Sequence, residues 1–155
     1  MRTRLASDEY RRKIISDFSL AEKIEDPELQ AKMAKFLCVR VSGYIEVFIK
    51  ERITNFIEDR KSHKVIKSYI QAAVKNITNL NNKKMVELLK SFSSDWAEHY
   101  ENNVTEEMKS SLGSVYSLRN NIAHGGNDSL SLLVLKDHYF NIEQLLDIVD
   151  KSISK

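Results

Sequence analysis

Apolar side chains recur at helical spacing along most of this chain. The pattern predicts a first helix over about residues 7–24. The pair Asp26-Pro27 then indicates a second helix, because aspartate is a preferred N-cap and proline is favoured at the first helical position. The apolar face behind this pair continues for roughly eight turns. Gly43 interrupts that face at a cost of about 1 kcal/mol relative to alanine, which indicates a close helix crossing or a bend.

The middle of the chain predicts two shorter helices. The third helix covers about residues 62–76, and the polar stretch 79–82 is typical of a turn. A fourth helix runs through Phe92, and Trp96 and Tyr100 are candidates to extend it. These two aromatic residues, four positions apart, fit a core or interface position better than a base-stacking platform.

The clearest start and stop signals enclose a fifth helix. Thr105 precedes two glutamates, and acidic residues are favoured in the first turn of a helix. The helix runs to about Ala123 or His124, where the pair Gly125-Gly126 is a C-cap signal.

The last predicted helix covers about residues 135–152, while residues 132–135 fit either a helical turn or a short extended piece. With only 4 glycines and 1 proline, the composition disfavours a β-rich or loop-rich fold. The sequence therefore predicts an all-α protein, a compact bundle of five to six helices that forms a single domain over residues 1–155.

Charge and cysteine content narrow the class of protein. The chain has 24 Lys+Arg against 22 Asp+Glu, a net charge of +2, so any contact with nucleic acid must come from local placement of charge. Apolar runs are too short to span a bilayer, and no signal peptide is recognisable. The single cysteine, Cys38, makes no internal disulfide and fits a core position. We expect a cytoplasmic protein that needs no membrane.

Arg119 stands out on the fifth helix because it falls in the middle of an apolar face. The face is formed by Met108, Leu112, Val115 and Ile122. A guanidinium cannot lose its proton, so its burial requires a carboxylate or a polar cleft at an interface. One interpretation is a structural ion pair, for example with Glu46 on the long helix.

His124 lies in the last turn of the same helix and shares a flank with Asn120, four residues before it. The helix dipole favours the imidazolium form of His124, and the charge of Arg119 opposes it. A histidine in that balance suits general acid–base chemistry near neutral pH, although a plain helix C-cap explains it equally well. His63, His99 and His138 have no partners at ligand spacing, so no metal or other cofactor is expected.

The string at residues 118–125, Leu-Arg-Asn-Asn-Ile-Ala-His-Gly, resembles the signature of the HEPN superfamily. That signature is an arginine, a polar residue that is often asparagine, and a histidine after a short gap, at the C-terminal end of a late helix. Arg119, Asn120 and His124 match it completely. Residues 42–46, Ser-Gly-Tyr-Ile-Glu, resemble the RiboL-PSP-HEPN-like branch of the same superfamily.

The resemblance implies a metal-independent endoribonuclease whose active site forms where two motif helices meet in a homodimer. It further implies attack of a ribose 2′-hydroxyl on the adjacent phosphate, with His124 as general acid or base. Arg119 would stabilise phosphorane charge and Asn120 would orient the histidine or hold a phosphate oxygen. Glu46 is the candidate that holds Arg119 in place. A role as a toxin or phage-defence effector, with a regulatory or antitoxin protein as partner, is the matching biological expectation.

Two other classes of function remain open from the residues. The first is a non-catalytic HEPN-like module that binds nucleotides or RNA or serves protein interaction. The second is a helical antitoxin or adaptor that uses the Arg119 face to bind a different protein. A self-dimer favours the shared catalytic site, whereas a one-to-one complex with another protein favours the adaptor.

Overall fold

The computed structural model describes residues 5–126 and 129–154, and this part of the chain forms seven α-helices and no strand. The prediction of an all-α fold is confirmed, and the expected five to six helices were too few. The helices are α1 (Ala6–Ala21), α2 (Pro27–Glu58), α3 (Lys64–Lys75), α4 (Asn82–Phe92), α5 (Ser94–Asn103), α6 (Glu106–Ala123) and α7 (Leu132–Ile153).

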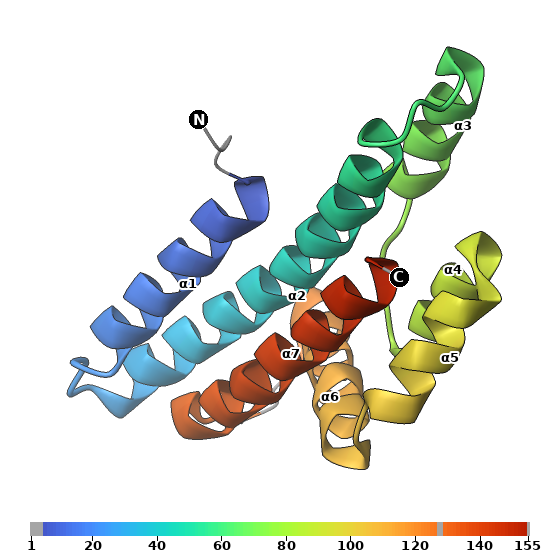
Figure 1. Cartoon of the computed structure of the whole chain (residues 1–155). Coiled ribbons are helices and arrows are strands. Elements are labelled where there is room, and N and C mark those ends of the chain that lie inside the picture. The colour runs from blue at the N-terminus through green and yellow to red at the C-terminus, as the bar shows by residue number, and fades with distance from the viewer. Residues whose placement is uncertain (1–4, 127–128, 155) are drawn as a thin grey trace.

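The long helix α2 is the axis of the fold (Figure 1). Its start is confirmed, because the Asp26 side chain accepts a hydrogen bond from the Leu29 N–H at 2.8 Å and Pro27 occupies the first helical position. Helices α1 and α7 lie alongside α2, and α6 crosses α2 and α7. Helices α4 and α5 form a pair that packs against α6 and α7, while α3 lies beyond them at the C-terminal end of α2.

Helix α1 packs against α2 along its length, and polar contacts near its start add to this packing. Leu5 occupies the N-cap of α1 and supplies no side-chain acceptor. The Glu51 carboxylate of α2 instead accepts from the Ala6 N–H at 2.7 Å and from the Ser7 N–H at 3.2 Å. Farther along, a Cβ on Gly43 would lie 3.2 Å from the Tyr10 hydroxyl, so this glycine serves a close helix crossing, as the sequence indicated.

The predicted extension of the fourth helix through Trp96 is wrong. Ser93 has extended backbone angles, φ −159° and ψ 130°, and separates α4 from α5. The break turns α5 so that Trp96 and Tyr100 both face the core, where they are 5% and 0% exposed. The prediction that both residues occupy core positions is confirmed. The change of direction between α4 and α5 was not predicted, because it depends on tertiary packing.

Residues 132–135 are helical, which resolves the ambiguity of the sequence pattern against an extended piece. The Ser131 hydroxyl caps α7 by accepting from the Val134 N–H at 3.1 Å. Leu132 and Leu135 are buried while Leu133 is 71% exposed, and this spacing is that of one helical face. Helix α7 therefore begins three residues before the predicted start at 135.

One continuous hydrophobic core joins α1, α2 and the later helices. Cys38 lies in it with no exposed surface, and its Sγ contacts the Val115 carbonyl oxygen at 3.6 Å. Among the described residues, no helix combines the length and the apolar character needed to cross a membrane.

Candidate active site

A glycine-terminated helix end positions the backbone of His124. Helix α6 ends at Ala123, and His124 is its C-cap. Gly125 has φ +73°, a conformation that glycine adopts without steric cost. Its N–H donates to the Ile122 carbonyl at 3.1 Å, and the Gly126 N–H donates to the Asn121 carbonyl at 2.8 Å. This pair of bonds is a Schellman motif, which confirms the predicted C-cap.

Arg119 lies on the face of α6 that the sequence indicated. Met108, Leu112 and Val115 on that face are buried, while Ile122 and Arg119 are half-buried. The apolar face therefore reaches the surface near its C-terminal end, where the guanidinium keeps part of its contact with water. Arg119 carries its charge at the border between the core and solvent.

The Arg119 guanidinium is oriented by its neighbour in the chain. Its Nη1 donates to the Asn120 side-chain oxygen at 3.2 Å. Within residues 5–126 and 129–154, no ion pair joins Arg119 to a carboxylate. Arg119 therefore shows no structural salt bridge in the described part of the chain.

Glu46 lies on α2, and its carboxylate forms a hydrogen bond with the backbone of Asn79. Its Oε1 accepts from the Asn79 N–H at 2.9 Å, in the turn before α4. Burial of Tyr116 raises the pKa of its phenol, the Glu46 carboxylate adds to the rise, and the Leu80 backbone and Arg119 oppose it. Glu46 and Arg119 thus act on the same buried tyrosine. A direct role of Glu46 in holding Arg119 stays a prediction.

His124 presents its ring at the surface. The residue is exposed, and its backbone N–H donates to the Asn120 carbonyl at 3.1 Å. The structure therefore places Arg119, Asn120 and His124 within the last two turns of one helix and its C-cap. The exposed His124 and the half-buried Arg119, at the same end of one helix, are both open to an anionic ligand.

The sequence reasoning did not single out a shallow groove of about 500 Å³ that runs along α6 toward the motif. Small residues recur on this helix face at spacings of three and four, which is the signal that would have found it. The groove is lined by Ser110, Gly113, Ser114, Ser117, Leu118, Asn121 and His138.

The remaining histidines have ordinary local partners. The ring of His138 lies 3.1 Å from the Ser111 hydroxyl, and burial lowers the pKa of this histidine. The ring of His99 lies 2.8 Å from the Ser152 hydroxyl, and His63 caps α3. Throughout the described part of the chain, no group of three or more His, Cys, Asp or Glu side chains is arranged to hold a metal ion.

The all-helical fold with this helix end fits a HEPN domain, and comparison with protein families agrees. The family model described as RiboL-PSP-HEPN matches residues 8–155. The chain belongs to the RiboL-PSP-HEPN family. Comparisons with curated proteins and with solved structures gave no match.

Proposed function

We propose that this protein is a metal-independent endoribonuclease that acts as a homodimer. One observation carries the proposal: a half-buried Arg119 without a carboxylate ion pair in the described residues lies in the last two turns of the helix that the exposed His124 caps. HEPN-family membership supports the same function, because catalytic members of this superfamily cleave RNA with an arginine and a histidine in this arrangement.

The proposed reaction needs one general base, one general acid and a stabiliser of negative charge. The His124 imidazole accepts the proton of a ribose 2′-hydroxyl, whose oxygen attacks the adjacent phosphorus. The bond to the 5′-oxygen breaks, and that oxygen takes up a proton. The products are a 2′,3′-cyclic phosphate and a free 5′-hydroxyl. The Arg119 guanidinium stabilises the charge on the phosphorane oxygens, while Asn120 orients that guanidinium.

A second copy of the chain would supply the second histidine. In a dimer with two-fold symmetry the same surface of each copy meets across the axis, so two α6 helices bring two His124 rings together. The small residues Gly113, Ser114 and Ser117 on the exposed side of α6 allow a close approach of two helices. A Cβ on Gly113 would meet no atom within 4 Å, so this surface is open in the single chain.

The biological role that fits this chemistry is that of a toxin or phage-defence effector. A reaction that needs only a ribose 2′-hydroxyl attacks many cellular RNAs. A cell that makes such an enzyme can grow only while another protein blocks its dimer interface or its active site. We therefore include a regulatory or antitoxin protein among the proposed partners.

Cleavage in the presence of EDTA tests the proposal. Purified wild-type protein and the double variant Arg119→Ala/His124→Ala are incubated with total RNA, and the fragment ends are determined. We expect only the wild type to cut and to leave cyclic-phosphate ends. Arg12→Ala, which removes an exposed arginine from α1, is the control for loss of positive charge and should cut like the wild type.

Two outcomes contradict the enzyme assignment. Cutting by the double variant, with circular dichroism showing the same fold, excludes Arg119 and His124 as the catalytic residues. Absence of cutting by a dimeric wild-type protein across total RNA supports the non-catalytic HEPN-like module that binds RNA or protein. Cutting that requires added magnesium rejects the metal-independent mechanism.

A further inference from the structure

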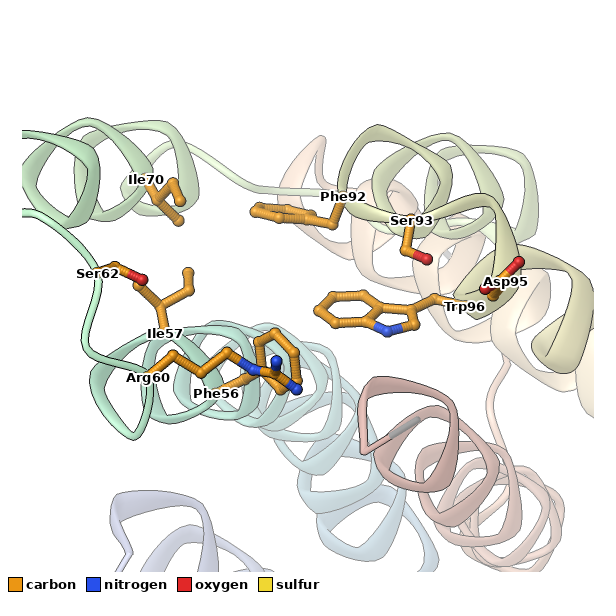
Figure 2. A pocket seen from close by; sticks show the side chains of 9 residues that line it. All are labelled: Phe56, Ile57, Arg60, Ser62, Ile70, Phe92, Ser93, Asp95 and Trp96. Carbon is orange, nitrogen blue, oxygen red and sulfur yellow. The ribbon is translucent and has the colours of Figure 1, made fainter.

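An aromatic-walled pocket lies at the opposite end of α2 from its N-cap, between α2, α3 and the α4–α5 junction (Figure 2). Its volume of about 380 Å³ is within the usual range for small-ligand sites. Phe92 and Ile70 line one side, Ile57 and Phe56 line the other, and Trp96 closes one end. The pocket is therefore a slot with two apolar sides, a shape that fits a flat ligand.

The aromatic rings hold one another in place. Phe56 meets Trp96 edge to face, with ring centroids 4.8 Å apart and planes at 87°. Phe92 stacks on Trp96 at 5.9 Å with planes at 23°. Such pairs are favourable ring geometries, so the slot is preformed in the absence of a ligand.

Polar groups occupy the edges of the slot. The Arg60 guanidinium lies over the Phe56 ring at 4.1 Å, and Ser62, Ser93 and Asp95 also line the pocket. An aliphatic side chain of a partner protein would leave these groups without partners. A nucleobase has apolar faces for the aromatic walls and a polar edge for the carboxylate and hydroxyls.

The charge of the surrounding segment favours a nucleic acid over a protein. Residues 60–86 contain seven Lys and Arg and no Asp or Glu, which leaves 17 basic against 22 acidic residues in the rest of the chain. The small net charge of +2 thus conceals a strongly basic segment. Six of its seven cations, all except Lys67, are exposed. Arg60 lines the aromatic pocket itself, and the other cations follow it along the same segment. An aromatic pocket combined with a basic segment is typical of proteins that bind single-stranded nucleic acid.

We infer that the pocket binds a nucleobase of single-stranded RNA and that residues 60–86 contact the flanking phosphates. The base lies between Phe92 and the Ile57–Phe56 side, and the Ser62 and Ser93 hydroxyls, which line the pocket, are available to its polar edge. Arg60 contacts the neighbouring phosphate. From Glu46, near the motif, to Phe56 the helix rise is about 15 Å, so one bound strand can reach both places. The inference extends the proposed function by giving the RNA a second point of attachment.

Trp96 fluorescence reports occupancy of the pocket directly, because the chain has one tryptophan. The protein is titrated with adenosine and guanosine monophosphates, and ribose 5-phosphate is the ligand without a base. We expect saturable quenching by both nucleotides and none by the sugar phosphate. Phe92→Leu keeps an apolar side chain but removes the stacking face, and should weaken nucleotide binding by about tenfold.

The basic segment is tested with a short single-stranded RNA in EDTA, using His124→Ala so that no cleavage occurs. Lys61→Ala/Lys64→Ala should weaken binding severalfold and lower its salt dependence. Lys136→Ala/Lys151→Ala, which removes two exposed lysines of α7, is the control and should bind like the parent. The inference is overturned if the nucleotides do not bind, if Phe92→Leu binds them as tightly as the wild type, or if ribose 5-phosphate quenches the fluorescence equally. It is also overturned if Lys61→Ala/Lys64→Ala binds RNA as tightly as Lys136→Ala/Lys151→Ala.

These readouts separate the two proposals, because binding is measured without catalysis. Nucleotide quenching with no RNA cleavage would retain the pocket and reject the ribonuclease assignment. RNA cleavage without quenching of Trp96 fluorescence by nucleotides would retain the ribonuclease assignment and reject the pocket as a base-binding site.

Discussion

The Arg119 guanidinium donates to the side-chain oxygen of Asn120, the next residue along α6, at 3.2 Å. Side chains of consecutive helical residues point in different directions, so this bond requires the long arginine side chain to bend across the helix surface. In the described part of the chain, an amide and not a carboxylate orients the cation. The positive charge of Arg119 is therefore not neutralised by its neighbour and stays available to an anionic ligand.

Asn120→Ala should lower ribonuclease kcat by about tenfold to a hundredfold with little change in KM. The physical reason is that Arg119 loses the group that orients it toward the transition state. Steady-state cleavage of a defined RNA measures the effect. Asn102→Ala, an exposed asparagine of α5, is the matched control and should behave like the wild type. A double-mutant cycle with Arg119→Ala should show strong non-additivity, and fully additive losses would reject the coupling.

Gly113 within α6 and Gly125 just after its C-cap should respond to alanine in opposite directions. Gly125→Ala should lower the free energy of unfolding by about 1 kcal/mol, because φ +73° is strained for a residue with a Cβ. Gly113→Ala, measured at a protein concentration at which the chain is monomeric, should raise it by about 1 kcal/mol through better helix propensity, since the added Cβ meets no atom of its own chain within 4 Å. Urea denaturation measures both values. If both variants changed the free energy of unfolding in the same direction, the left-handed conformation of Gly125 would be contradicted.

Ser117→Arg should convert the proposed homodimer into a monomer. Ser117 is exposed on the small-residue side of α6, and an arginine from each copy would bring two charges and two long side chains into the helix contact. Light scattering measures the mass, and cleavage should be lost together with the dimer. Asn102→Arg adds the same charge to an exposed position on α5 and should remain dimeric. A dimer that survives Ser117→Arg would place the interface elsewhere.

Stability should fall at high pH through Cys38. Burial raises the pKa of this thiol to about 12, whereas an unfolded cysteine titrates near 8.5 to 9. Between these values the folded chain keeps a proton that the unfolded chain has lost, so ionisation favours unfolding as pH rises. From pH 8 to 10.5 the wild type should lose about 2 kcal/mol more than Cys38→Ala.

Urea denaturation at a series of pH values tests this difference. Other titrating groups are common to both chains and cancel in the comparison. Parallel pH profiles of the wild type and Cys38→Ala would show that the thiol ionises freely in the folded protein.

Local signals in the sequence were sufficient for several helix ends and for the placement of the motif on its helix. The N-cap at Asp26, the start at Thr105 and the stop at Gly125 each depend on residues within four positions of one another, so a short stretch of chain determines them. The position of Arg119 on the apolar face followed from periodicity, and that of His124 at the helix end followed from the two glycines after it.

Tertiary packing decided what local signals left open. Ser93 separates α4 from α5 although Trp96 continues the helical spacing, because burying the indole against Phe56 requires the chain to turn. The Glu46 carboxylate accepts from Asn79, a partner 33 residues away that no local signal indicated. The aromatic pocket joins residues from three distant stretches of the chain. Periodicity records which residues become buried, but only the packed helices determine which of them meet.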